Sequence, residues 1–248
     1  MKKLYGLIGF PLGHSFSSQY HNDRFRRDNI DARYDNYELS DISLLPSLVK
    51  QQPMLMGLNV TIPHKENVLP YLDDVDSVAQ RIGAVNVIKI IRNDSGVRMV
   101  GYNSDYVGFR NSIESLLLPH HTHALVLGSG GASKAVSTAL RDMGLSVKIV
   151  SRTPRCGELS YGELTDEIMS QYTVIINATP VGMHPHVDAC VAIPYDKITS
   201  RHLCYDVVYN PSMTLFMSKS AAQGAVVSNG LSMLHGQADV AWKIWNNE

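Results

Sequence analysis

A glycine-rich loop between a short apolar strand and a helix is the feature that most constrains the fold. Residues 124–127 read as a buried strand, which ends in the run Gly128-Ser129-Gly130-Gly131-Ala132. The pattern then predicts a helix to about Met143 and a second strand over residues 146–150. A strand, a tight glycine turn, a helix and another strand form a parallel βαβ unit, so we expect an α/β fold with a mostly parallel sheet here.

The remaining short apolar runs extend this α/β pattern along the chain. They predict strands over residues 4–9, 34–39, 55–60, 85–91, 97–102, 172–176, 203–208 and 225–227. Helices are predicted over residues 18–29, 104–117 and 231–245. Asn93-Asp94-Ser95-Gly96 is a strong hairpin-turn signal between two of the strands. The pattern of apolar and polar residues changes between residues 103 and 125. We therefore predict a domain boundary there, with helix 104–117 connecting two parts.

Composition excludes several other classes of protein. The chain has 248 residues, of which 44% are hydrophobic, enough for one large core or two modest ones. A formal net charge of −1 provides no field for nucleic acid or an anionic membrane, and no apolar run reaches membrane-spanning length. Cys156, Cys190 and Cys204 are widely spaced and form neither a disulfide framework nor a metal pair. We therefore expect a soluble protein in the reducing cytoplasm.

Other residue clusters have plain structural explanations. The histidines at positions 120, 121, 123, 184 and 186 have no acidic or cysteine partner at ligand spacing, so we predict no metal site. Arg24, Arg26 and Arg27 are interpreted as a solvated helix face. Trp242 and Trp245 are three residues apart on a predicted helix and should both face a core.

The glycine loop fits a dinucleotide-binding turn. Gly128 would permit the tight turn, and Gly130 would let the backbone reach a pyrophosphate at the helix N-terminus, where amide donors favour anions. The third glycine of the usual fingerprint would fall at Ser133. The alternative is an ordinary strand-to-helix turn, but the strand–loop–helix–strand context favours a dinucleotide.

The end of the following strand indicates which dinucleotide. An NAD site usually places an acid about 20 residues after the glycines, to bind the ribose hydroxyls. Here the strand ends in Ser151-Arg152-Thr153, with no acid, and a guanidinium with two hydroxyls suits a 2′-phosphate. We therefore expect NADP(H), the alternative being that Arg152 and Arg155 are ordinary surface residues.

A lysine and an aspartate are the candidate catalytic pair. Lys65 follows a predicted strand, and loops at the carboxyl ends of strands carry the chemistry of open α/β sheets. Asp105 begins a predicted helix, where the helix dipole favours a carboxylate. Reduction of a ketone needs a hydride on carbon and a proton on oxygen, and such a pair can supply the proton and stabilise the alkoxide. The sequence leaves open which residue delivers the proton, and Asp105 alone could be a helix cap.

Hydroxyl and amide side chains supply candidate substrate contacts. Ser15 and Ser17 would point to one side of an extended segment, where paired hydroxyl donors suit a carboxylate. The alternative for Ser17 is a helix N-cap. Asn59, Asn86 and Asn103 lie at or near predicted strand ends, where they could bind ring hydroxyls or serve as turn residues.

Taken in order along nearly the whole chain, these segments resemble the shikimate dehydrogenase family. The matching motifs are Gly9-x-Pro11 to His14-Ser15-x-Ser17, Asn59-Val60-Thr61-Ile62-Pro63-x-Lys65, Gly83-Ala84-Val85-Asn86, Gly101-x-Asn103-Ser104-Asp105-x-x-Gly108-Phe109, Gly128-Ser129-Gly130-Gly131-Ala132, Ser151-Arg152-Thr153, Asn177-Ala178-Thr179-Pro180-x-Gly182-Met183, Asp206-x-Val208-Tyr209 and Gly230-x-x-Met233-Leu234-x-x-Gln237. The family commonly has asparagine where this chain has Ser151, so the match is weaker at the adenosine phosphate.

The resemblance implies an N-terminal α/β substrate domain, residues 1–103, joined by the C-terminal helix 229–248, and a Rossmann-type NADP-binding domain, residues 104–228. It implies NADPH-dependent reduction of 3-dehydroshikimate to shikimate in aromatic amino-acid and chorismate biosynthesis, with Lys65 and Asp105 as catalytic residues. The implied substrate contacts are Ser15, Ser17, Asn59, Thr61, Asn86, Tyr209 and Gln237. The implied cofactor contacts are Gly128, Ser129, Gly130, Gly131, Ala132, Ser151, Arg152, Thr153, Thr179, Val207 and Gly230.

Two other functions remain as alternatives. One is a quinate/shikimate dehydrogenase with broader substrate and cofactor use, against which Ser17 and the missing acid after Val150 argue. The other is a non-catalytic NADP-binding regulator, which would have no reason to keep Lys65 together with Asp105. The expected partner is a small-molecule substrate, with neither nucleic acid nor membrane, and the chain would act as a monomer or a homodimer.

Overall fold

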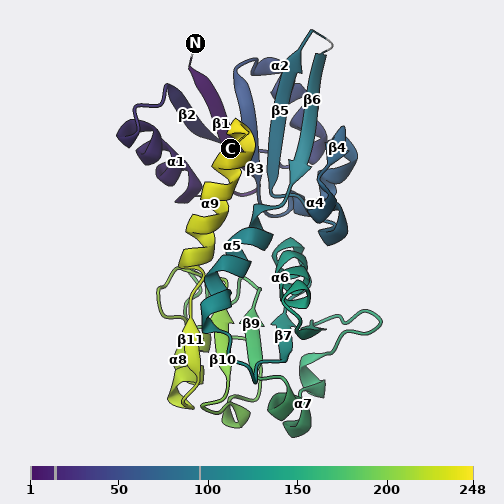
Figure 1. Ribbon diagram of the computed structural model, residues 1–248, viewed down its shortest axis with the longest axis vertical. Helices are drawn as coiled ribbons and strands as arrows, with labels where there is room; N and C mark the ends of the chain where they lie inside the picture. Colours follow the sequence, from purple (N-terminus) through teal and green to yellow (C-terminus); the bar gives the residue numbers. More distant parts are fainter. Residues whose placement is uncertain (1, 14–15, 95, 248) are drawn as a thin grey trace. The chain divides into compact units, whose positions relative to one another are not determined.

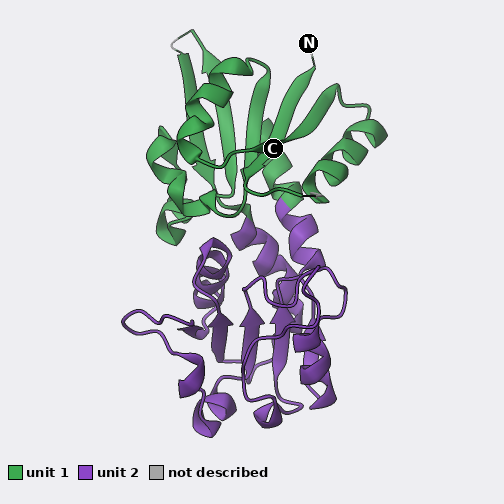
Figure 2. Cartoon of the chain, turned by 180° about the vertical axis from the view of Figure 1, so that it is seen from behind, with its two compact units in different colours: residues 1–104, 238–248 green, residues 105–237 purple. Residues whose placement is uncertain are grey.

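The computed structural model describes residues 2–13, 16–94 and 96–247, and the chain divides into two compact units (Figure 2). Unit 1 comprises residues 1–104 and 238–248, and unit 2 comprises residues 105–237. Each unit has its own sheet, and most strand pairs are parallel. The predicted α/β fold class is confirmed.

Unit 1 is built on a mixed sheet with strand order β2-β1-β3-β5-β6-β4. Its strands are β1 (Lys3–Gly9), β2 (Ala32–Glu38), β3 (Leu55–Val60), β4 (Asp74–Val75), β5 (Val87–Asn93) and β6 (Gly96–Tyr102). Its helices are α1 (Phe16–Arg27), α2 (Leu45–Gln51), α3 (His64–Asn67), α4 (Ser77–Ile82) and the end of α9 (Leu231–Asn246), with 3-10 turns at Ile42–Leu44 and Leu69–Tyr71. β1 runs parallel to β2 and β3, whereas β5 is antiparallel to β3 and β6.

Alternate residues of the unit 1 strands face two different cores. Tyr5 and Leu7 of β1 pack with α1 and α9 on one face of the sheet. Ile8, the next residue, packs on the other face with residues from α2 and α4. This alternation follows from the two-residue period of a strand, and it puts Asn59 of β3 on the face that α1 covers, since Leu58 and Val60 belong to the second core.

Unit 2 is built on a parallel sheet with strand order β11-β10-β9-β7-β8 (Figure 1). Its strands are β7 (His123–Leu127), β8 (Ser146–Val150), β9 (Val174–Asn177), β10 (Leu203–Asp206) and β11 (Val226–Ser228). Its helices are α5 (Ser104–Ile113), α6 (Gly131–Asp142), α7 (Asp166–Gln171), α8 (Leu215–Ala222) and the first turns of α9, with 3-10 turns at Glu114–Leu116, Tyr161–Glu163 and Tyr195–Lys197.

The helices of unit 2 cover both faces of its sheet. Val136 of α6 packs on one face of the sheet, with residues of α5 and α9. Met169 of α7 and Phe216 of α8 pack on the other face. Because β7 lies between β8 and β9, the strand order reverses at β7, and ligands of open α/β sheets bind at such a point.

Several elements differ from the sequence prediction. The first helix begins at Phe16 rather than residue 18, and the helix predicted over 104–117 ends at Ile113 and continues as a 3-10 turn. The short helices α2, α3, α4, α7 and α8 were not predicted. The predicted hairpin is confirmed, because β5 and β6 pair antiparallel with Asn93 opposite Gly96, although Ser95 of its turn lies outside the described residues.

The two tryptophans both face the core of unit 1, as predicted. The indole N–H of Trp245 donates to the carbonyl of Ile88 at 3.1 Å. The same ring lies directly against Gly57 of β3, in the space that a Cβ there would occupy. A glycine at this position therefore lets the last helix seat on the sheet.

We expect Gly57→Ala to destabilise unit 1 by about 1–3 kcal/mol, because its methyl group would overlap the ring of Trp245. The chain has two tryptophans, both in unit 1, so tryptophan fluorescence during urea unfolding measures this unit. The control is Ser47→Ala, which changes an exposed residue of α2 in the same unit. Equal midpoints for the two variants would contradict the packing argument.

Candidate functional site

Three asparagines of unit 1 lie at one edge of its sheet. β1 and β3 end at this edge, whereas the antiparallel β5 starts there. In the register, Asn59 is opposite Val87, which is opposite Tyr102 of β6. Asn86 therefore precedes β5, and Asn103 follows β6, at the edge where Asn59 lies.

The side chain of Asn86 holds the beginning of α5. Its Oδ1 accepts a hydrogen bond from the backbone N–H of Ser104 at 2.7 Å, and its Nδ2 donates to the Ser104 hydroxyl at 3.0 Å. Nearby, Asn103 Nδ2 donates to the carbonyl of Ala84 at 2.9 Å. These bonds fix the backbone immediately before Asp105, which lies in the first turn of α5.

Lys65 lies in α3, after the turn that follows β3. Its carbonyl accepts a hydrogen bond from the N–H of Val85 at 2.8 Å. Val85 therefore holds the backbone of Lys65. Asn86, the next residue, holds Ser104, which precedes Asp105 in the chain. Lys65 belongs to unit 1 and Asp105 begins unit 2, and the pairing of their side chains stays a prediction.

Thr61 shapes the turn between β3 and α3. Its N–H donates to the carbonyl of Ile8 and its carbonyl accepts from the N–H of His64, both at 2.9 Å. Its methyl group lies 2.5 Å from where a Cβ on Gly9 would be. Because Gly9 has no side chain, β1 can end directly beside Thr61.

The predicted serine pair is only partly described. Ser15 lies outside the described residues. Ser17 lies in the first turn of α1, so it is neither in an extended segment nor the helix N-cap, and the two-residue alternation does not apply to it.

In unit 2, the ends of β7 and β9 bring two predicted cofactor residues together. Gly128 has a φ of +107°, which favours glycine, and a Cβ there would lie 2.9 Å from the Thr179 methyl carbon. Asn177 holds Thr179 through its Oδ1, which accepts from the Thr179 N–H at 3.1 Å and hydroxyl at 2.6 Å. The loops after β7 and β9 therefore meet at the point where the strand order reverses.

The N-terminus of α6 fits a bound pyrophosphate. Its N-cap is Gly130, with no side-chain cap, so the N–H groups of the first turn, Gly131 and Ala132 included, can serve an external acceptor. A Cβ at Gly130 would meet no atom within 4 Å, so internal packing does not require glycine there and the backbone is open to a ligand. Ser133, in place of the third glycine, donates to the carbonyl of Gly128 at 2.5 Å and ties the loop to the helix.

An acid that the sequence analysis missed lies beside the predicted 2′-phosphate loop. The Ser151 hydroxyl donates to Glu158 Oε2 at 3.3 Å, and the same oxygen accepts from the Arg155 N–H at 3.0 Å. Arg152 and Thr153 are exposed in this loop. The prediction considered only residues adjoining the strand, whereas Glu158 returns to the loop after a turn.

The remaining unit 2 candidates lie around β10, α5 and α9. Gly230 packs directly on the Val207 carbonyl, in the space that a Cβ would need, and Tyr209 follows in the same loop as Val207. Gln237 lies on α9 against α5, where a Cβ on Gly108 would be 2.8 Å from the Gln237 N–H nitrogen. Within unit 2, Val207 therefore contacts Gly230. Gln237 contacts α5 at Gly108, about one helical turn after Asp105.

Asp206 at the end of β10 organises the neighbouring loops. Its carboxylate accepts from the Thr214 hydroxyl at 2.6 Å, the Asn177 side chain at 3.0 Å and the Val208 N–H at 3.0 Å. Burial raises the pKa of Asp206 to about 6, although these three donors act in the opposite direction. Asn177 therefore joins the loop that carries Thr179 to the loop that carries Val207.

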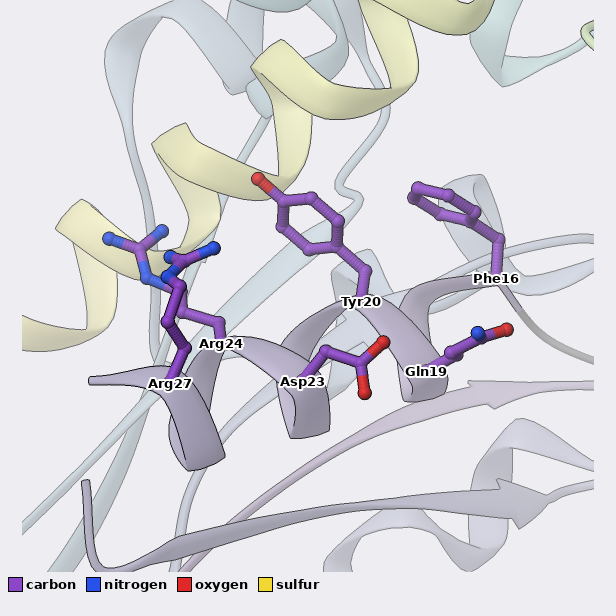
Figure 3. A pocket seen from close by; sticks show the side chains of 6 residues that line it. All are labelled: Phe16, Gln19, Tyr20, Asp23, Arg24 and Arg27. Atoms are coloured by element: carbon purple, nitrogen blue, oxygen red, sulfur yellow. The ribbon is translucent and has the colours of Figure 1, made fainter. Parts of the chain in front are cut away.

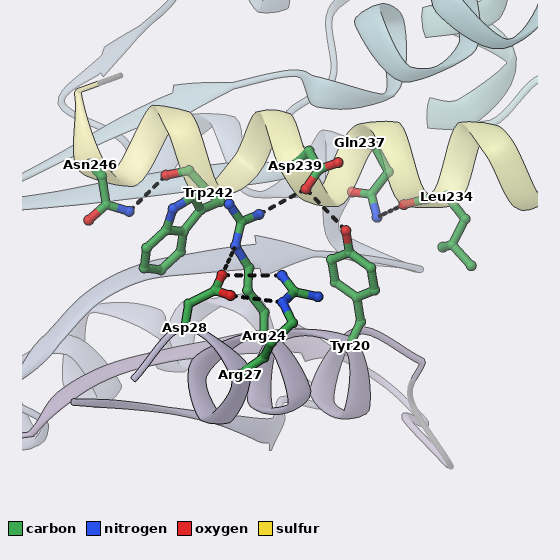
Figure 4. A network of polar contacts seen from close by, with 9 residues as sticks. All are labelled: Tyr20, Arg24, Arg27, Asp28, Leu234, Gln237, Asp239, Trp242 and Asn246. Carbon is green, nitrogen blue, oxygen red and sulfur yellow. Dashed lines mark hydrogen bonds and ion pairs between the residues drawn. The ribbon is translucent and has the colours of Figure 1, made fainter. Parts of the chain in front are cut away.

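A hollow of about 210 Å³ lies along α1 (Figure 3). It is lined by Phe16, Gln19, Tyr20, Asp23, Arg24 and Arg27, none of which is a predicted site residue. Figure 4 shows that Arg24 and Tyr20 bind Asp239 of α9, at 2.8 and 3.0 Å. Arg26 and Arg27 are solvated as predicted, but Arg24 is not, since it also stacks on the ring of Trp242.

Residues 2–13, 16–94 and 96–247 contain no group of three or more histidine, cysteine, aspartate or glutamate side chains arranged to hold a metal ion. His120 and His121 each place Nε2 3.1 Å from the carbonyl of Arg201. None of the described helices is both long and apolar enough to cross a bilayer.

Sequence comparison with known proteins identifies the family of this chain. Residues 7–88 match the shikimate dehydrogenase substrate binding domain. A shikimate dehydrogenase (NADP(+)) from Carboxydothermus hydrogenoformans is 38% identical over 98% of this chain and 91% of that protein. Another from Bacillus cereus strain B4264 is 35% identical over 99% and 93%. This chain belongs to the shikimate dehydrogenase family.

A solved structure of the same family has the same fold. The crystal structure of shikimate 5-dehydrogenase from Thermus thermophilus in complex with NADP(H) and shikimate matches with a TM-score of 0.86 and 30% identity. The match covers 99% of this chain and 94% of that one. The two alternatives, a quinate/shikimate dehydrogenase and a non-catalytic regulator, are not favoured by these matches to shikimate dehydrogenases.

We expect Gly230→Ala to raise the KM for NADPH about tenfold, because the methyl group would push the start of α9 away from Val207. Overpacking of 1–3 kcal/mol corresponds to a change of about that size or more. Steady-state kinetics measures it, with Gly162→Ala as the neutral control in the same unit. An unchanged KM would show that this close approach does not shape the cofactor site.

We expect Asp206 to make the stability of the protein depend on pH between about 4 and 6. Its native pKa is raised above the 3.8 of an ordinary aspartate, so the native state binds a proton that the unfolded state has lost in this window. The free energy of unfolding should fall as pH rises, by on the order of 3 kcal/mol from this group.

Far-UV circular dichroism during urea unfolding at several pH values measures this effect. Asp206→Asn should lose this pH dependence, so its stability deficit relative to the wild type should shrink as pH rises from 4 to 6. Parallel pH profiles for the two proteins would be inconsistent with a raised Asp206 pKa.

Proposed function

We propose that this chain reduces 3-dehydroshikimate to shikimate with NADPH, and that unit 1 binds the substrate and unit 2 the cofactor. The observation that carries the proposal is the anchoring of Lys65 on Val85 and of Ser104, the residue before Asp105, on Asn86. Val85 and Asn86 are consecutive residues at the sheet edge that carries Asn59, which supports a joint role for Lys65 and Asp105. The segment that matches the family's substrate binding domain lies within unit 1.

The residues of unit 2 fit a dinucleotide phosphate. The open first turn of α6 would hold the pyrophosphate, and the loop after β8 would meet the 2′-phosphate. NADPH, when bound, supplies the hydride. The proposed contacts are Gly128, Ser129, Gly130, Gly131, Ala132, Ser151, Arg152, Thr153, Thr179, Val207 and Gly230.

Substrate recognition is assigned to hydroxyl and amide groups. Ser15 and Ser17 would donate to the carboxylate, which offers only acceptors. The ring and its hydroxyls would meet Asn59, Thr61, Asn86, Tyr209 and Gln237. Asn86 keeps a second N–H for this purpose, because only one of its two Nδ2 hydrogens is needed for Ser104.

The acid–base step is assigned to Lys65 and Asp105. As the carbonyl carbon gains a hydride, its oxygen gains negative charge and then a proton. The Lys65 ammonium can donate that proton and stabilise the charge, and the Asp105 carboxylate would orient the ammonium. In the reverse direction the same lysine accepts the hydroxyl proton.

Net charge and free cysteines support the proposed ligand class and cellular location. The formal net charge of −1 gives no attraction to nucleic acid or an anionic membrane, so small molecules are the proposed ligands. Cys156, Cys190 and Cys204 are free thiols, in keeping with the reducing cytoplasm. A monomer or a homodimer is the proposed working form.

Turnover of 3-dehydroshikimate tests this function directly. The purified protein should consume NADPH, measured by its absorbance, only when 3-dehydroshikimate is present, and NADH should be a poorer reductant. Quinate and shikimate, offered with NADP or NAD, separate this activity from a broader one. Folded protein that leaves the absorbance unchanged would end the proposal.

Lys65→Ala should lower kcat by about 100-fold or more, since a positioned acid–base group contributes at least that much. The Kd for NADPH, measured by fluorescence titration, should stay within about twofold. Lys50→Ala, which removes an exposed lysine of α2, is the matched control and should retain full activity. Equal losses in kcat and in NADPH binding would speak against an acid–base role for Lys65.

A further inference from the structure

The carboxylate of Glu158 lies at the end of β8, beside the loop proposed to bind the 2′-phosphate of NADPH. Glu158 is partly buried, and its Oε2 accepts hydrogen bonds from the Ser151 hydroxyl at 3.3 Å and from the Arg155 backbone N–H at 3.0 Å. Neither donor is charged, so these bonds leave the negative charge of the carboxylate in place. All three residues belong to unit 2, so their arrangement does not depend on the placement of unit 1.

The backbone on both sides holds Glu158 at this position. Gly157, the residue before it, has a φ of +85° and turns the chain back toward β8. Leu159, the residue after it, pairs with β8. Its N–H donates to the carbonyl of Ile149 at 2.8 Å, and its carbonyl accepts from the N–H of Ser151 at 2.9 Å. The backbone of Glu158 is therefore fixed beside Ser151.

The end of this strand is where a Rossmann-type unit distinguishes the two dinucleotides. NAD enzymes place a carboxylate there, which accepts hydrogen bonds from the ribose hydroxyls, whereas NADP enzymes place an arginine nearby for the 2′-phosphate. In this chain Arg152 and Thr153 are exposed in the loop directly after β8, and Glu158 returns to the same strand end. The site therefore carries a group of each kind.

The hydroxyl of Ser151 can serve only one anion at a time. It has a single proton, which it donates to Glu158 in this structure. A 2′-phosphate offers strong acceptors, so Ser151 can donate to it only by turning that proton away from the carboxylate. The carboxylate then loses one of its two hydrogen bonds and lies beside a second negative charge, which repels it. The 2′-hydroxyl of NADH, in contrast, can donate to the carboxylate.

We propose that Glu158 is a specificity-determining residue that weakens the binding of NADPH relative to NADH. Arg152 attracts the 2′-phosphate and Glu158 repels it, so the preference for NADPH is the difference between two opposing effects. The inference rests on the proposed function, because that function assigns the 2′-phosphate to the loop after β8.

Glu158→Gln removes the charge and keeps an oxygen that can accept from Ser151 and Arg155. The Kd for NADPH, measured by fluorescence titration at low ionic strength, should fall about fivefold, the size expected of one charge interaction near the surface, and the Kd for NADH should stay the same or rise. Glu167→Gln is the matched control, because it removes the same charge from an exposed residue of α7, and it should change neither constant. Circular dichroism checks that both variants fold.

Two further measurements separate charge repulsion from a structural role in the loop. Salt screens charges, so the gain in NADPH affinity should largely disappear at about 1 M salt, whereas a change in loop structure would persist. Adenosine 2′,5′-bisphosphate should bind E158Q more tightly than the native protein, and adenosine 5′-monophosphate, which lacks the 2′-phosphate, should show no such gain. An unchanged ratio of the two cofactor constants in folded E158Q, or weaker NADPH binding, overturns the proposal. If E158Q does not fold, the same ratio in Glu158→Ala decides.

Arg152→Gln distinguishes failure of this inference from failure of the proposed cofactor contact. It should raise the Kd for NADPH about tenfold, because it removes a charged donor to the phosphate. If R152Q weakens NADPH binding and E158Q changes nothing, only the role of Glu158 is lost. If neither variant changes NADPH binding, the proposed 2′-phosphate contact is lost as well. Absence of turnover with 3-dehydroshikimate would end the proposed reaction, while the binding constants would still decide the role of Glu158.

Discussion

Two hydrogen bonds between Asn86 and Ser104 are the constraint on which the positions of the proposed catalytic residues depend. They hold Ser104, the last residue of the first segment of unit 1, by both its N–H and its hydroxyl. The first residue of α5 is therefore fixed by a side chain that is itself held at the start of β5. Since Val85 also binds the carbonyl of Lys65, two adjacent residues hold the backbone of Lys65 and that of Ser104, the residue before Asp105. A ligand that contacts Asn86 would touch the same residue that holds the start of α5.

In unit 2, close packing at two glycines fixes the positions of the loops that follow the strands. Gly128 lies against the methyl group of Thr179, and Gly230 lies against the Val207 carbonyl, so four loops at the carboxyl ends of the strands pack closely in two pairs. Asp206 and Asn177 then tie two of these loops by hydrogen bonds. The proposed cofactor site is thus made largely of backbone, which explains why its motif consists of glycines and small residues rather than of charged side chains.

The sequence predicted the parts of the fold that depend on local patterns. Buried strands appear as short apolar runs, and the glycine loop marks the first crossover of unit 2. The short helices were missed because four to eight residues are too few to show a helical period. Their caps are nevertheless visible in the sequence: Asp76 begins α4, which ends at Gly83 with a positive φ, and Thr214 begins α8. These caps were a usable signal for the missed helices.

The candidate site was harder to predict where it depends on contacts between distant segments. Tyr34 has the pattern of an ordinary core residue in a strand, and only folding brings its hydroxyl to Asn59, 25 positions away. Glu158 returns to Ser151 through a turn at Gly157, which has a positive φ, but the contact between the two side chains exists only in the folded loop. The extended geometry assumed for Ser17 was wrong because α1 begins one residue earlier, at Phe16. The pairing of Lys65 with Asp105 stays a prediction.

The final helix has a consequence for how the chain is made. α9 begins in unit 2 and ends in unit 1, where it delivers Trp242 and Trp245 to a core otherwise built from the first hundred residues. A ribosome synthesises those residues first and the two tryptophans only after unit 2. All of unit 2 has therefore been synthesised before unit 1 can close its core, which reverses the usual amino-to-carboxyl order of domain completion. Until α9 emerges, the surface around Tyr5 and Gly57 lacks the helix that completes its packing.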